Sequence, residues 1–121
     1  MDKTIKIGER DIKLRANALL PITFRAEFGE DIFKKQMQVF SVFGQGKNTA
    51  ANINSEINVI DIMKMIYAMA KLADKNILPF EKWLEEIEEF PVFDVVNQAA
   101  DMFMVNMTST TKIKNANAAG K

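Results

Sequence analysis

Polar and apolar residues alternate at the start of the chain. In segments 3–7 and 11–15 every second residue is apolar, and Gly8-Glu9-Arg10 separates the two segments. A period of two is typical of strands, and a short connection that contains glycine is typical of a hairpin. We therefore predict an N-terminal β-hairpin whose buried face carries Ile5, Ile7, Ile12 and Leu14. A lone hairpin is marginally stable in water, so we expect it to dock on helices.

After the hairpin the apolar spacing becomes helical. Leu20, Phe24 and Phe28 recur at every fourth position and predict a helix that ends at Gly29, where a glycine suits a C-cap. A second helical stripe follows the acidic pair Glu30-Asp31, since negative charge is favourable at a helix N-terminus. That stripe contains Ile32, Phe33, Gln36, Met37, Phe40 and Phe43.

Three further helices are predicted in the second half. The first spans roughly 56–75 after Ser55 as a candidate N-cap, and its broad apolar surface indicates a central position. Pro79 begins a short helix that ends before Pro91. The last helix spans roughly 92–106. The residues expected to face inward in these last two helices are Phe80, Trp83, Leu84, Ile87, Val92, Val96, Ala99, Ala100 and Phe103.

These elements define the expected fold class, which is mainly α within an α+β arrangement. We predict one compact domain over 1–107, built from the hairpin and about five helices. The polar tail 108–121 is expected to be flexible, because it has a single large apolar residue. Segment 44–54 has the composition of a loop.

Two residue types are missing from the chain. It contains no cysteine and no histidine, which removes disulfides, thiol nucleophiles and the commonest general base and transition-metal ligand. Zinc hydrolases and enzymes with Ser-His-Asp or Cys-His sites are thereby excluded within this chain. We expect no catalytic site, no metal site and no cofactor.

Charge is unevenly distributed although the net charge is zero. Residues 1–47 hold nine basic and six acidic residues, 48–107 hold four and ten, and 108–121 hold three lysines. The acidic second half argues against a nucleic-acid partner. The most apolar stretch, 57–73, contains Asp61, Lys64 and Lys71, which argues against a membrane span. We expect a cytoplasmic protein.

Two short patterns have a chemical alternative. Glu85, Glu89 and Asp94 could supply carboxylates to Mg²⁺ in an enzyme, although a run of charges is usually a solvated helix face. Gly44-Gln45-Gly46-Lys47 resembles part of a phosphate-binding loop, but its spacing is incomplete and it follows a helix. We interpret the first pattern as surface and the second as a linker.

Methionine is abundant, with eight residues in 121. Methionine fills irregular cores, and it also lines adaptable binding surfaces. The last predicted helix is apolar nearly all round, and a small domain cannot easily cover both of its sides. Self-association or partner binding is therefore expected, with candidate partner-binding residues Phe33, Met37, Phe40, Met102, Phe103, Met104 and Met107.

Two stretches carry a family resemblance. In Asn17–Lys34, the residues Phe24, Arg25, Phe28, Gly29, Asp31 and Ile32 match an aromatic-Arg-x-x-Phe-Gly-x-Asp-Ile pattern, and 79–84 provides a Phe-x-x-Trp-Leu helix. With the hairpin before them, these stretches resemble the tail assembly chaperones of long-tailed (siphovirus-type) phages and prophages of Gram-positive bacteria.

The resemblance implies a helical, self-associating protein without catalysis or cofactor. Such a chaperone would bind the tape measure protein, recruit tail tube subunits, act in the host cytoplasm and be absent from the mature virion. The family commonly makes a second, longer product by a frameshift near the end of the shorter reading frame, here the tail from Thr108. One alternative stays open, namely a small helical adaptor or inhibitor of a prophage that binds one bacterial protein.

Overall fold

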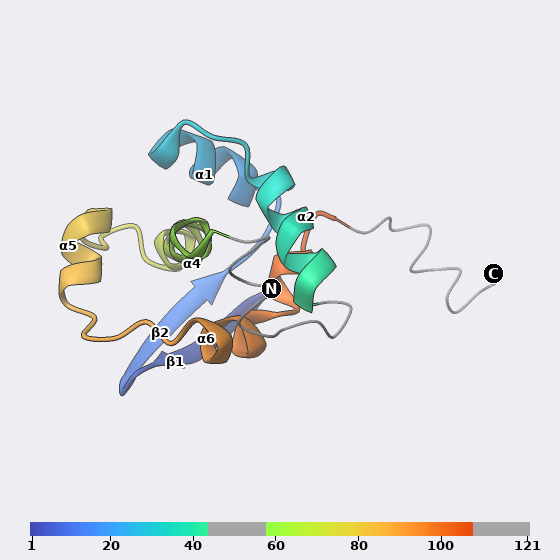
Figure 1. The fold of residues 1–121 in the computed structure, drawn as a ribbon. Coiled ribbons are helices and arrows are strands. Elements are labelled where there is room, and N and C mark those ends of the chain that lie inside the picture. Colours follow the sequence, from blue (N-terminus) through green and yellow to red (C-terminus); the bar gives the residue numbers. More distant parts are fainter. Residues whose placement is uncertain (44–57, 108–121) are drawn as a thin grey trace.

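The computed structural model describes residues 1–43 and 58–107 (Figure 1). Strand β1 (Asp2–Ile7) pairs antiparallel with β2 (Arg10–Arg15), and Ile5 lies opposite Ile12. Gly8 has a φ of 66° at the first position of the two-residue turn, where glycine suits a type II′ hairpin. The four apolar side chains predicted to face inward are all buried. The hairpin prediction is therefore confirmed.

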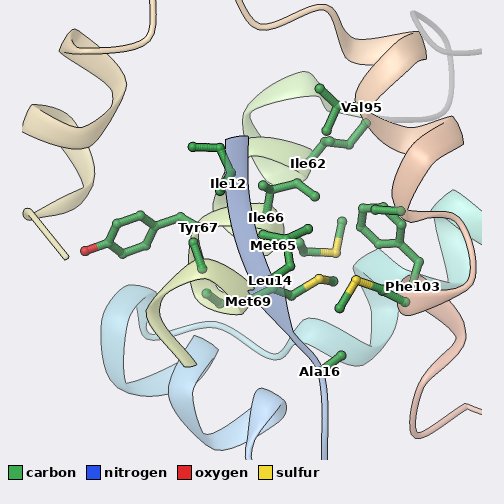
Figure 2. Packing of buried hydrophobic residues seen from close by; sticks show 14 of the residues in the cluster. Ile12, Leu14, Ala16, Ile62, Met65, Ile66, Tyr67, Met69, Val95 and Phe103 are labelled. Atoms are coloured by element: carbon green, nitrogen blue, oxygen red, sulfur yellow. The ribbon is translucent and has the colours of Figure 1, made fainter. Parts of the chain in front are cut away.

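Helix α4 (Val59–Ala73) lies at the centre of the fold. It packs on β2 and on α1 (Leu20–Phe28). Figure 2 shows Ile12 and Leu14 of β2 among side chains of α4, including Ile66. Eight of the fifteen residues of α4 are buried, so its broad apolar surface is explained by neighbours on several sides.

An aromatic cluster joins α1, α4 and α5 (Phe80–Glu85). Tyr67 of α4 lies edge-on to Phe28, Phe80 and Trp83, with ring centroids 6.1, 5.3 and 5.3 Å away. Such edge-to-face pairs add stabilisation beyond the burial of apolar area. The Tyr67 hydroxyl donates a hydrogen bond to the carbonyl oxygen of Leu78 at 2.7 Å, so this buried ring keeps a polar partner.

Helix α6 (Val92–Ala99) packs beside β1. The side-chain amide of Gln98 accepts a hydrogen bond from the Lys6 backbone N–H at 2.8 Å and donates one to the Lys6 carbonyl at 2.7 Å. The Lys3 ammonium pairs with Asp101 just after the helix, at 2.8 Å. These contacts tie the C-terminal segment to the outer edge of β1.

The last helix is shorter than the 92–106 predicted. It ends at Ala99, and a single 3₁₀ turn, η1 (Met102–Met104), follows it. Val105 is extended and Asn106 has a φ of 74°, so the chain leaves the helical conformation there. The inward set is also partly wrong, because Ala100 is exposed. Met102 and Phe103 of this 3₁₀ turn are both buried in the core.

The other predicted helices are present, although α4 and α5 are shorter than predicted. Gly29 ends α1 with a φ of 69°, and α2 spans Ile32–Phe43. Helix α4 begins at Val59 rather than near 56, because Asn58 caps it by accepting a hydrogen bond from the Ile60 N–H. The described ranges hold one hairpin and five α-helices, which confirms the expected fold class. Ser55, the 44–54 loop and the 108–121 tail lie outside them.

Candidate partner-binding surface

Helix α2 presents two apolar stripes. Ile32, Gln36 and Val39 are at most 2% exposed and face the core. The residue that follows each of these three in the sequence belongs to the second stripe. Its members Phe33, Met37 and Phe40 are 49%, 48% and 39% exposed. We call these three residues the α2 stripe. They follow the i, i+4, i+7 spacing with which one helix binds the apolar face of another.

The position of α2 is fixed at its start. Gly29 reverses the chain after α1, and the Asp31 carboxylate accepts a hydrogen bond from the Phe33 N–H at 3.0 Å. The Lys35 ammonium lies 3.1 Å from Asp61 of α4 and 3.7 Å from Glu30. The α2 stripe is thus displayed by a helix that is capped and tied to the central helix.

Salt bridges between α4 and the segment of α1 and α2 shift the pKa of one carboxylate and of one ammonium group. A hydrogen bond from Lys64, helped by the charge of Lys35, lowers the pKa of Glu30 below its ordinary value. The Glu27 carboxylate accepts a hydrogen bond from Lys71, which raises the pKa of that lysine. Both interactions join α4 to the segment that carries the family resemblance.

Most residues of that resemblance have a structural role. Phe24 and Ile32 are fully buried, and Phe28 belongs to the aromatic cluster. Gly29 and Asp31 shape the turn between α1 and α2. Arg25, in contrast, is exposed on α1. The pattern therefore encodes the α1–α2 corner and, through it, the orientation of the α2 stripe.

Two of the seven candidate partner-binding residues are not accessible. Met102 and Phe103 are 0% and 1% exposed, so their side chains belong to the core of the folded chain and not to its surface. Met104 and Met107 are half-buried. Figure 2 shows Phe103 directed into the core from the C-terminal segment.

The contact that holds this segment is made by Gln36. Its side-chain amide nitrogen donates hydrogen bonds to the carbonyl oxygens of Phe103 and Val105, at 3.1 and 3.3 Å. Sequence reasoning placed Gln36 in an apolar stripe but gave it no role. The sequence did contain a signal for this role. Gln36 is an amide between the apolar residues Ile32 and Val39 on the inward side of the helix, and a buried amide needs hydrogen-bond partners.

The acidic run lines part of a hollow next to the hairpin turn. This hollow has a volume of about 510 Å³, and Gly8, Glu9 and Arg10 line one side while Glu86, Glu88 and Glu89 line the other. The Arg10 guanidinium donates to the Glu86 carbonyl oxygen at 2.9 Å.

The acidic residues of the described ranges do not converge on a common point. Within residues 1–43 and 58–107, no group of three or more acidic side chains has an arrangement that could hold a metal ion. The carboxylate of Asp94 instead accepts a hydrogen bond from Gln98. Glu85, Glu89 and Asp94 are therefore not gathered into a site. The Gly44–Lys47 pattern lies outside the described residues.

Comparisons with models of known protein families, with curated proteins and with solved structures found no match. In the part of the chain that the structure describes, no helix has the length and apolarity needed to cross a membrane.

Proposed function

We propose that this protein is a non-enzymatic tail assembly chaperone of a long-tailed phage or prophage. It binds the tape measure protein, recruits tail tube subunits, acts in the host cytoplasm and is absent from the mature virion. The observation that carries the proposal is the exposed α2 stripe of Phe33, Met37 and Phe40, displayed at helix-binding spacing. The resemblance of Asn17–Lys34 to that family supports it, because the same residues orient the stripe.

The size of the stripe suits a client that is held and later released. The three exposed fractions correspond to roughly 250 Å² of side-chain surface, since large apolar side chains bury about 150–250 Å² each. A stable interface needs about 800 Å² per partner. At about 25 cal/mol per Å², the stripe contributes roughly 6 kcal/mol before the cost of association is subtracted. Each copy would therefore hold a helix weakly, and many copies along a long client would hold it well.

The test is co-expression with the tape measure protein encoded by the same phage or prophage genome. The soluble fraction of the tape measure protein should rise when the wild-type chaperone is present. The triple variant F33S/M37S/F40S should lose this effect, because three exposed side chains are changed and the buried stripe of α2 is left intact.

A matched control lies at the start of α1. Leu19 and Ile22 are 52% and 65% exposed and do not belong to the α2 stripe. L19S/I22S should therefore solubilise the tape measure protein as well as wild type does. If both variants solubilised the tape measure protein equally well, the α2 stripe would not be the surface that binds it. No effect of the wild-type protein, together with tight capture of one host protein, would favour the adaptor or inhibitor alternative.

A further inference from the structure

The two edges of the hairpin differ in their hydrogen bonding. Met1 and Ala16 exchange a reciprocal pair of backbone hydrogen bonds, both 2.9 Å long. Bonded and non-bonded pairs alternate along an antiparallel ladder, so Asp11, Lys13 and Arg15 direct their backbone N–H and C=O groups away from β1. Within residues 1–43 and 58–107, no group hydrogen-bonds to these backbone atoms. On the outer edge of β1, in contrast, the backbone N–H and C=O of Lys6 are already hydrogen-bonded to the Gln98 side chain.

The charges along the β2 edge have an ordered sequence. The solvent-facing residues from the turn onward are Glu9, Asp11, Lys13 and Arg15, which read acid, acid, base, base. All four are exposed. Helix α4 packs on the opposite side of the strand, where Ile12 and Leu14 are buried (Figure 2).

This order is self-complementary for an antiparallel copy. When Ile12 lies opposite Ile12 of a second copy, Asp11 lies opposite Lys13 of that copy, and Glu9 opposite Arg15. All four charged pairs across the new junction are then of opposite sign, which stabilises cross-strand neighbours. A register centred on Lys13 would place two lysines opposite each other and is disfavoured.

We propose that two copies of this chain associate through their β2 edges into one antiparallel four-stranded sheet centred on Ile12. The existing ion pairs permit this. Asp11 pairs with Lys6 and Arg15 with Asp2, both at 2.9 Å and exposed, and a carboxylate can accept from several donors. Lys13 has no ion-pair partner among the described residues. The inference does not depend on the proposed function, since the α2 stripe lies on another element.

Charge reversal tests the junction. Sedimentation equilibrium should show a wild-type dimer. D11K and K13D each turn two attractive pairs into repulsive ones, so each should weaken association by about tenfold or more. The double variant D11K/K13D restores opposite charges and should recover the wild-type dimer. K34D makes the same charge change as K13D at an exposed position of α2, away from the β2 edge, and should dimerise normally. Circular dichroism establishes that every variant is folded.

Cross-linking tests the register, because the chain has no native cysteine. Opposed residues in a bonded pair have Cα atoms about 5.5 Å apart, within the range of a disulfide. A mixture of D11C and K13C should therefore form a disulfide-linked pair on oxidation, and neither variant alone should do so efficiently. A monomer of 13.7 kDa at every concentration up to high micromolar would overturn the proposal. Equal cross-linking of either single variant, or no rescue by the double variant, would also overturn it.

Discussion

Replacing Gln36 with leucine would test what keeps the C-terminal segment against α2. Gln36 is 1% exposed, and its amide donates to the carbonyls of Phe103 and Val105. Leucine has a similar volume, so the substitution removes both hydrogen bonds without opening a large cavity. The change therefore isolates the polar contact from the packing of α2.

The expected loss of stability follows from the burial of the two carbonyls. A buried acceptor left without a donor costs about 1–3 kcal/mol, and the partly buried Val105 carbonyl can recover part of this from water. Burial of the apolar leucine offsets some of the loss. We expect the free energy of unfolding to fall by about 1–3 kcal/mol.

Urea unfolding followed by the fluorescence of Trp83 provides the assay, since this is the only tryptophan of the chain and it is buried. The urea midpoint of Q36L should fall with an unchanged slope. Q38L is the control, because Gln38 is half-buried on the same helix and its amide makes no hydrogen bond within 1–43 and 58–107; a change within about 0.5 kcal/mol is expected. A Q36L midpoint equal to or above wild type would refute the reasoning.

Three further substitutions probe other contacts. A hydrogen bond from Lys3 lowers the pKa of Asp101 below its ordinary 3.8, so this pair stabilises the fold above that pH and the contribution is lost as pH falls below it. D101N should therefore be less stable than wild type at neutral pH, and its stability should decline less on acidification; parallel pH profiles would contradict this. G29A should cost about 1 kcal/mol in urea unfolding, because a Cβ there meets no atom within 4 Å but the φ of 69° disfavours alanine. Y67F should cost about 1 kcal/mol through the loss of the hydrogen bond to Leu78, and an unchanged midpoint would show that bond to be unimportant.

The elements that sequence reasoning predicted are those with local causes. The alternation of the hairpin, Gly29 at the end of α1 and Pro79 before α5 each act within a few residues of their own position. The exposure of Phe33, Met37 and Phe40 could not be derived in this way, but helical spacing did place them together on one side. Their role in binding stays a prediction.

The features that sequence reasoning missed depend on contacts between residues far apart in the sequence. Met102 and Phe103 are buried because Gln36, 67 residues before Phe103, bonds to the backbone there. The end of α6 is held by Lys3, 98 residues before Asp101. A helical apolar pattern over 92–106 contains neither partner, so it predicted one continuous and partly exposed helix. Only the tertiary structure shows that the chain turns inward after Ala99.

Gln98 has a further consequence for how large an assembly can become. Its amide occupies the Lys6 N–H and C=O and so stands where a neighbouring strand would have to bind. A sheet with two open edges can add chains without limit, whereas one blocked edge per chain makes any assembly by strand pairing closed and two-fold symmetric. Helix α6, which carries Gln98 and is also tied to this edge by the Lys3–Asp101 pair, would in this way separate a finite dimer from a fibre.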